Sequence, residues 1–188
     1  MRETIKASPR LPGNNASDNN LARMIRVDHA GEYGAVQIYR GQLAVLGHTS
    51  SGKTIQHMEA QERAHLKKFD ELISEHGVRP TVLSPIWNVA GYALGAATAL
   101  MGEKTAMACT AAVEEVIDEH YAAQAAALTG DGEEHAAFKQ TIEEFRADEI
   151  AHRETALKNG AEDAPGFRVL SDVIKIGCRF AIRMSERF

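Results

Sequence analysis

Apolar residues recur every three or four positions along most of this chain, which is the spacing of one buried face of an α-helix. No stretch alternates apolar and polar residues in the manner of a half-buried strand. Glycines follow three of the periodic stretches, at Gly47, Gly77 and Gly160, where helices commonly end. The sequence therefore predicts an all-α protein. Its expected helices cover residues 21–46, about 50–77, 103–128, 133–159 and 167–187.

Residues 81–102 form an apolar segment that is less regular than the helices on either side. The segment has no charged residue, but Pro85, Asn88 and several glycines interrupt it. Two interpretations stay open. The segment is either a buried crossover between two helical hairpins, or it lies in a membrane interface, where Trp87 and Tyr92 are typical residues.

The first 20 residues are rich in Asn, Ser and Pro and contain no apolar run of the kind found in a signal peptide or a membrane span. Such a composition buries too little apolar surface to order itself, so we expect residues 1–20 to form a flexible N-terminal tail. Residues 21–188 are then enough for one domain with a sizeable core.

Composition narrows the class of protein without identifying a function. A net charge of −5 argues against a general nucleic-acid-binding protein, and neither zinc-finger spacing nor interleaved basic and aromatic residues occur. The two cysteines, Cys109 and Cys178, are far apart in sequence and form no Cys-x-x-Cys motif. We expect both to be reduced core thiols in a reducing compartment, by default the bacterial cytoplasm.

Two Glu-x-x-His motifs occur, Glu62 with His65 and Glu149 with His152. In each, the spacing places a carboxylate and an imidazole on one face of a helix, about one turn apart. A chain of this composition contains about one such pair by chance, so the motif alone does not distinguish a metal site from a solvated helix face.

An internal repeat makes the stronger case. An offset of 82 residues aligns the first helix with the third, which places Glu32 on Glu114 and Tyr39 on Tyr121. An offset of 87 residues aligns the second helix with the fourth, which places the segment ERAH on EIAH. Each half thus offers one glutamate on its first helix and Glu-x-x-His on its second. This pattern predicts a ferritin-like four-helix bundle built from two repeated helical hairpins, followed by a C-terminal amphipathic helix.

Six side chains are the expected ligands of two metal ions in such a bundle. Each turn lies midway between the ligands that it separates, so the ligands of one hairpin lie level. Glu32 and Glu114 also fall on apolar helix faces, where a bare carboxylate is unfavourable unless cations compensate it. Nitrogen and oxygen ligands favour two iron ions, with manganese as the next choice, and Glu62 and Glu149 as bridges. The expected ligands are Glu32, Glu62, His65, Glu114, Glu149 and His152.

Nearby acidic and imidazole side chains fit the repeat less well. Glu59 lies one turn before Glu62 but aligns with Arg146, so we expect it to be solvated. Glu115 is the main alternative to Glu114, one residue away. The other histidines that we expect in solvent are His48, His57, His76 and His135.

Several segments resemble demethoxyubiquinone hydroxylase, the ferritin-like di-iron monooxygenase family of ubiquinone biosynthesis. These segments are RVDHAGEYGA at 26–35, the paired ERAH and DEIAH motifs, VEEVIDEHYAAQ at 113–124 and the ending GCRFAIRMSERF. The resemblance extends over about residues 21–188 and carries the family's iron ligands to the six residues that the repeat selects. It implies hydroxylation of the ring of a demethoxy-polyprenyl benzoquinol, of the 2-polyprenyl-3-methyl-6-methoxy-1,4-benzoquinol type, by O₂ with reducing equivalents from NADH. A ferritin-like ferroxidase or iron store is the alternative.

Some residues have no counterpart in the other half of the repeat. Asp28, His29 and His120 align with Thr, Ala and Ile, so they are candidates for the substrate side, with an ordinary structural or surface position as the alternative. In the resembling family, His120 and Tyr121 are candidates for proton or electron delivery to the quinone. Tyr39 and Tyr121 lie two turns beyond a ligand glutamate, and we expect structural hydrogen bonds from both.

The C-terminal helix suggests peripheral contact with a membrane. Lys175, Arg179, Arg183 and Arg187 recur every four residues among apolar side chains, as in helices that bind anionic headgroups. Packing against the bundle is the alternative. No segment is a convincing membrane span, and we expect the protein on the cytoplasmic face of a bacterial inner membrane. Because an exposed apolar 81–102 segment would promote aggregation, we also expect a homo-oligomer or a lipid-binding partner protein.

Overall fold

The computed structural model describes residues 16–128 and 132–188, and the described residues contain helices but no strand. The predicted all-α, ferritin-like bundle is thereby confirmed. Six α-helices and one short 3₁₀ turn, η1, make up the fold. They are α1 (Ala16–Leu46), α2 (Gly52–His76), α3 (Ser84–Leu100), α4 (Glu103–Ala127), α5 (Glu133–Lys158), η1 (Ala161–Asp163) and α6 (Phe167–Ser185).

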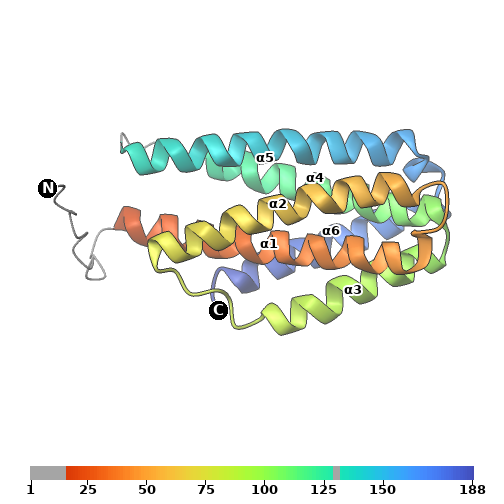
Figure 1. The fold of residues 1–188 in the computed structure, drawn as a ribbon, viewed down its shortest axis with the longest axis horizontal. Helices are drawn as coiled ribbons and strands as arrows, with labels where there is room; N and C mark the ends of the chain where they lie inside the picture. Colours follow the sequence, from red (N-terminus) through yellow and green to blue (C-terminus); the bar gives the residue numbers. More distant parts are fainter. Residues whose placement is uncertain (1–15, 129–131) are drawn as a thin grey trace, which may run out of the picture.

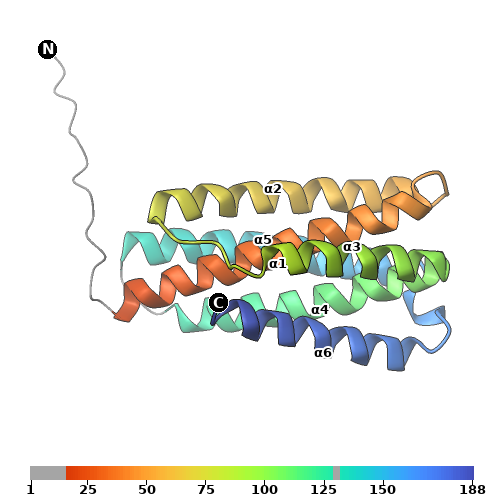
Figure 2. The same cartoon turned by 90° about the horizontal axis from the view of Figure 1, so that it is seen from below.

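Helices α1, α2, α4 and α5 run alongside one another as the central bundle (Figure 1). Within it α1 packs on α2, and α4 packs on α5. The two additional helices attach to different members of the bundle, because α3 packs mainly on α1 and α6 mainly on α4. Seen from below, α3 and α6 lie on the same side of the molecule (Figure 2). The bundle therefore has one face that two extra helices cover.

The first helix begins earlier than the sequence pattern predicts. Helix α1 starts at Ala16, so residues 16–20 of the expected tail are helical. The helix extends because Leu21, Met24 and Ile25 are buried in a cluster with residues from the C-terminal part of α2 and the N-terminal part of α5. These contacts fix the first turns of α1. The rest of the expected tail, residues 1–15, lies outside the described residues.

Most of the apolar segment 81–102 forms a regular helix, α3, which connects the two hairpins and is only partly buried. Its glycines are its contact surface, since a Cβ on Gly95 would overlap the carbonyl oxygen of Ile38 on α1. On the opposite side, a Cβ on Gly41 of α1 would overlap the backbone of Tyr92. Only one face of the segment is buried. The exposed apolar side chains are Val82, Ile86, Val89, Tyr92, Leu100 and Met101.

Helix α6 buries Ile174 against the bundle, leaves other apolar side chains exposed, and turns part of its basic side to the bundle. Lys175 donates to Glu115 at 2.5 Å and Arg179 donates to Glu119 at 2.8 Å, and both acceptors lie on α4. Two of the four evenly spaced cations are thus engaged in packing, the alternative that the sequence left open. The exposed apolar side chains of α6 are Val169, Val173, Ile176 and Phe180.

None of the helices in the described part of the chain is long and apolar enough to cross a membrane.

Candidate metal centre

Six buried side chains meet between the four bundle helices, and they are the six that the repeat selects. Helix α1 contributes Glu32 and α4 contributes Glu114, while α2 and α5 each contribute the two residues of a Glu-x-x-His motif. Each of the six is at most 2% exposed. Four carboxylates and two imidazoles without solvent would be strongly unfavourable unless protons or cations compensate them.

The six residues fall into two groups that share two members. Within each group, one ligand atom per residue lies within 4.8 Å of the others, as is required for ligands of one ion. Glu62 and Glu149 belong to both groups, which is the arrangement that bridging carboxylates need. The first group is Glu32, Glu62, His65 and Glu149, and the second is Glu62, Glu114, Glu149 and His152.

Unpaired polar atoms show where cations fit. Thirteen buried side-chain nitrogen or oxygen atoms of the described residues have no hydrogen-bond partner, and eight of them belong to these six residues. Both oxygens of Glu62 and of Glu149 are unpaired, as a bridge requires. Glu32 and Glu114 each have one oxygen without a hydrogen bond, and each histidine lacks one only at Nδ1, which lies close to carboxylates of the cluster instead. The donor set therefore fits two divalent cations.

Two tyrosines hold the remaining oxygen of each outer glutamate. Tyr39 of α1 donates to Oε1 of Glu114 at 2.5 Å, and Tyr121 of α4 donates to Oε1 of Glu32. Each tyrosine thus fixes the glutamate of the opposite hairpin and leaves its Oε2 without a hydrogen bond. The structural hydrogen bonds expected of Tyr39 and Tyr121 are confirmed.

Protons compensate the charge of this cluster when no cation does. Burial, followed by repulsion between neighbouring carboxylates, raises the pKa values of Glu62 and Glu114 well above their usual range. Burial also raises the pKa of Glu149, to about 7. Burial alone would lower the pKa of His65, but contacts with Glu149 and Glu32 outweigh it and raise this pKa to about 11. A centre that holds protons so tightly is one where cations can replace them.

Both histidines turn the same nitrogen toward the centre. Nδ1 of His65 lies 3.2 Å from Glu149, and Nδ1 of His152 lies 2.9 Å from Glu62. The other nitrogen, Nε2, contacts a side chain outside the six. His65 Nε2 lies 3.1 Å from Oδ2 of Asp148, and His152 Nε2 lies 3.2 Å from Oε1 of Gln61.

One pair of the residues without a repeat counterpart lies beside the centre. Oδ1 of Asp28 accepts hydrogen bonds from Nε2 of His120 at 2.9 Å and from Gln124 at 2.8 Å. Burial raises the pKa of Asp28; burial would lower the pKa of His120, but the bond to Asp28 raises it. His29 belongs elsewhere, because it contacts Asp70 at the surface at 3.0 Å.

The prediction that Glu59 is solvated was wrong. Glu59 is only 6% exposed and lies 3.1 Å from Nε of Arg63, one turn further along α2. The ion pair with Arg63 offsets the cost of burying the Glu59 carboxylate. The alignment of the two repeats could not reveal this pair. Glu115 lies outside both groups and contacts Arg153 at 3.0 Å, so the one-residue alternative to Glu114 is not what the structure shows. The remaining histidines are exposed or partly exposed: His48, His57, His76 and His135.

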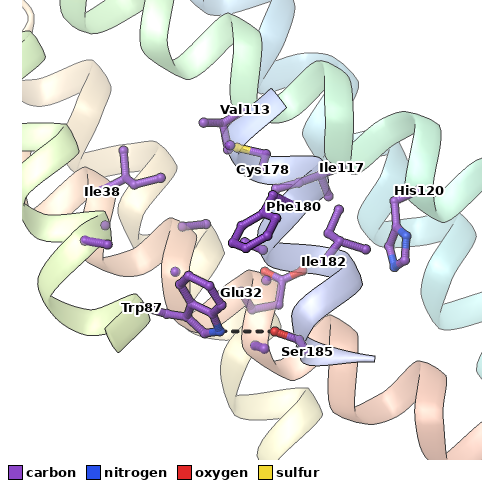
Figure 3. A pocket seen from close by; sticks show the side chains of 18 of the residues that line it. Glu32, Ile38, Trp87, Val113, Ile117, His120, Cys178, Phe180, Ile182 and Ser185 are labelled. Carbon is purple, nitrogen blue, oxygen red and sulfur yellow. Dashed lines mark hydrogen bonds between the residues drawn. The ribbon is translucent and has the colours of Figure 1, made fainter. Parts of the chain in front are cut away.

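A cavity of about 430 Å³ leads to one side of the centre, between α1, α3, α4 and α6. Its lining is almost entirely apolar, and Glu32 is the only expected ligand in it. Figure 3 shows the Glu32 side chain among Trp87, Phe180 and Ile182. Trp87 donates from Nε1 to Oγ of Ser185 at 3.1 Å, which joins α3 to α6 beside the cavity. The remaining polar residues of the lining are Asp28, His120 and Tyr121.

Sequence reasoning missed most of this lining. The residues that α6 contributes, such as Phe180 and Ser185, lie in the resembling ending but belong to no ligand motif, and only the packing of α6 on α4 places them beside Glu32. Cys178, expected to be a core thiol, instead lines the cavity, while Cys109 is buried; both are free thiols, as predicted.

Comparison with known proteins is consistent with this geometry. The family model of the ubiquinone biosynthesis protein COQ7 matches residues 19–185. The 3-demethoxyubiquinol 3-hydroxylase of Rhodospirillum rubrum is 52% identical over 182 residues, which are 96% of this chain and 84% of the relative. The human NADPH-dependent 3-demethoxyubiquinone 3-hydroxylase, mitochondrial, is 54% identical over 92% of this chain and 80% of its own length. The 5-demethoxyubiquinone hydroxylase, mitochondrial, of Saccharomyces cerevisiae is 40% identical over 89% and 78%.

Proposed function

The chain belongs to the COQ7 family of ubiquinone biosynthesis proteins, and from this membership we propose that it hydroxylates the ring of a demethoxy-polyprenyl benzoquinol with O₂. The expected family is thereby confirmed, and the substrate is the 2-polyprenyl-3-methyl-6-methoxy-1,4-benzoquinol type that the resemblance implies. The observation that carries the proposal is an apolar cavity that reaches a doubled group of buried carboxylates and imidazoles at Glu32.

The proposed cofactor is a pair of iron ions. Glu62 and Glu149 would bridge the two ions, because they belong to both groups and have both oxygens unpaired. The four terminal ligands would be Glu32, His65, Glu114 and His152. When bound, the iron pair supplies the activation of O₂ that an aromatic ring hydroxylation requires.

The cavity suits the ring and the first part of an isoprenoid tail. A volume of about 430 Å³ is typical of sites for small molecules, and apolar walls favour an isoprenoid over water. Excluding water also protects a reactive oxygen species from side reactions. The polar atoms near Glu32 come from Tyr121 and His120, so the quinol head group is expected there, with the tail leading toward α3 and α6.

His120 is the proposed proton carrier of the site. Its Nε2 donates to Asp28, so Nδ1 is left to exchange a proton with a quinol hydroxyl. Asp28 holds the ring and stabilises its protonated form. Tyr121 is bound to Glu32 and links the same region to the metal ligands. His120 thus remains a candidate for proton delivery, with Asp28 as its positioning residue.

The reductant is proposed to be a nicotinamide cofactor. The resemblance implies NADH, whereas the printed name of the human relative specifies NADPH. Steady-state oxidation of each cofactor by the iron-loaded protein, with and without quinone, decides between them.

Peripheral contact with a membrane is also proposed, on the cytoplasmic face of a bacterial inner membrane. The support is the exposed apolar surface of α3 and α6, which lie on the same side of the bundle (Figure 2). Val89 on α3 and Ile176 on α6 are 70% and 66% exposed. Exposed apolar surface of this kind is also suited to a second copy of the chain or a lipid-binding partner protein.

Mass spectrometry of membrane quinones from a deletion strain tests the proposed function. Accumulation of the demethoxyquinone, reversed by the intact gene, is the expected result. Normal quinones in the deletion strain would contradict it. A ferroxidase, the alternative, gives no role to an apolar cavity beside Glu32, and its loss would disturb iron content and leave quinones normal.

A further inference from the structure

The residue that contacts each ligand histidine from outside occupies the same place in the repeat. Asp148 immediately precedes Glu149, and Gln61 immediately precedes Glu62, so the offset of 87 residues places Gln61 on Asp148. Each of them contacts the histidine of the opposite hairpin, at 3.1 Å for His65 and 3.2 Å for His152. The geometry is repeated while the chemistry differs, because one acceptor is a carboxylate and the other is an amide.

The difference between a carboxylate and an amide partner affects the ring nitrogen that faces the metal centre. With Nδ1 of each imidazole directed at the centre, Nε2 carries the ring proton and donates it outward. A carboxylate acceptor withdraws that proton more strongly than an amide oxygen, so the opposite nitrogen becomes a stronger electron donor. His65, which contacts Asp148, is therefore the stronger ligand, and His152, which contacts Gln61, is the weaker one.

The stronger histidine lies on the cavity side. His65 is grouped with Glu32, and Glu32 is the expected ligand that lines the cavity. His152 is grouped with Glu114, which is absent from that lining. The carboxylate ligands themselves are matched between the two positions, because each outer glutamate has one tyrosine donor and each bridge has two unpaired oxygens.

We propose that Asp148 and Gln61 make the two metal positions unequal, so that the position beside the cavity binds a divalent cation more tightly than the other. Asp148 and Gln61 are positioning residues, since they act through the histidines. The inference rests on the proposed two-metal centre and deepens it. In the cell, this order keeps the ion next to the quinol bound when metal is scarce.

A titration of the metal-free protein with Co²⁺ under anaerobic conditions tests the inequality, because the visible spectrum of Co²⁺ reports its ligands. The protein should bind one Co²⁺ tightly and a second one more weakly. Asp148→Asn replaces the carboxylate partner of His65 by an amide like that of Gln61, and it should weaken the first step by about 10- to 100-fold, the usual effect of mutating an outer partner of a ligand histidine. Diffraction from crystals with one equivalent of Co²⁺ should place the ion in the group with His65.

The chain supplies a matched control and a reciprocal variant. Asp70→Asn makes the same carboxylate-to-amide change 3.0 Å from His29, a histidine outside the centre, and should leave both binding steps unchanged. In the double variant Asp148→Gln, Gln61→Asp, the first Co²⁺ should move to the group with His152. Circular dichroism and thermal unfolding confirm that each variant is folded.

Two results separate the possible failures. Two equal Co²⁺ sites that Asp148→Asn does not change would overturn the inequality and leave the two-metal centre standing. Failure of the parent protein to bind two Co²⁺ ions would overturn the centre itself, and the inequality with it.

Discussion

The two ends of the candidate metal centre have the same ligands and different surroundings. At one end Tyr121 holds Glu32, and at the other Tyr39 holds Glu114. Beyond the glutamates the ends diverge. A cavity of about 430 Å³ adjoins Glu32, whereas Glu114 is enclosed by packed side chains.

Residue substitutions within the repeat explain the difference. We call the end of the centre at Glu32, which the cavity adjoins, the open end, and the end at Glu114 the closed end. At the open end, Asp28 and His120 correspond to Thr110 and Ile38 in the other half of the repeat. Gly34, which lines the cavity, corresponds to Val116, which is 2% exposed. The duplicated part of the sequence thus defines where metals can bind, and the part that has diverged defines where a substrate can reach them.

The shared ligands carry the largest expected effect. Replacing either bridge, by Glu62→Ala or Glu149→Ala, removes two oxygens that both groups use. We expect loss of both irons and hydroxylation below detection, since each ion loses a ligand at once. Iron analysis together with a quinol assay measures this. Glu59→Ala, one turn away and outside both groups, is the control that should retain iron, and full iron occupancy in a bridge variant would refute the assignment.

The next largest effect should come from replacing a polar residue beside Glu32 by its repeat counterpart from the enclosed half of the centre, beside Glu114. His120→Ile removes the proposed proton carrier, and we expect kcat to fall by about 100-fold, typical of losing a general acid or base. Asp28→Asn should lower kcat less and shift the pH–rate profile, because the ring stays but its positioning carboxylate is lost. Iron content should not change in either variant.

Thr110→Val is the matched control for these two variants, since it alters the position equivalent to Asp28 at the closed end. It should leave kcat within about threefold of the parent. If His120→Ile turned over quinol like the parent protein, His120 would be structural.

Filling the cavity should have a smaller effect, on substrate binding. A Cβ on Gly34 meets no atom within 4 Å and Gly34 lines the cavity, so the side chain of Gly34→Val, which copies Val116, should extend into the cavity volume. We expect KM for a quinol to rise about 10-fold with iron content unchanged. Stability should hold or rise, since valine favours a helix more than glycine does. Gly34→Ala should give a smaller increase, and an unchanged KM in both variants would place the substrate elsewhere.

The smallest expected effect concerns the metal-free protein. A carboxyl whose folded pKa is raised, such as Glu149 at about 7, stabilises the folded state below its unfolded value of 4.5. That contribution is lost as the pH rises through about 7. Thermal unfolding of the metal-free protein should therefore occur at lower temperature at pH 8 than at pH 5.5, by a few degrees per kcal/mol lost.

Metal loading should remove this trend, because cations replace the protons of Glu149 and its neighbours. A metal-free protein whose unfolding temperature rises between pH 5.5 and 8 would show that these carboxyls do not hold protons in the folded state.

The sequence predicts more of the centre than of the cavity. Helical periodicity and the repeat indicate the bundle and all six expected ligands, because ligands on packed helices must recur at fixed spacing. The start of α1 at Ala16 depends on contacts of Leu21 and Met24 with distant helices, which local pattern does not contain. The cavity wall from α6 and the burial of Glu59 by Arg63 likewise arise only from tertiary packing.

A single-turnover reaction with iron-loaded protein tests the central claim most directly. The protein is reconstituted anaerobically with Fe²⁺, freed of excess metal, counted for iron per chain, and exposed to quinol and ¹⁸O₂. The account predicts two irons per chain and one ¹⁸O atom in the ring of the product. One metal ion per chain, or a product without ¹⁸O, would contradict it.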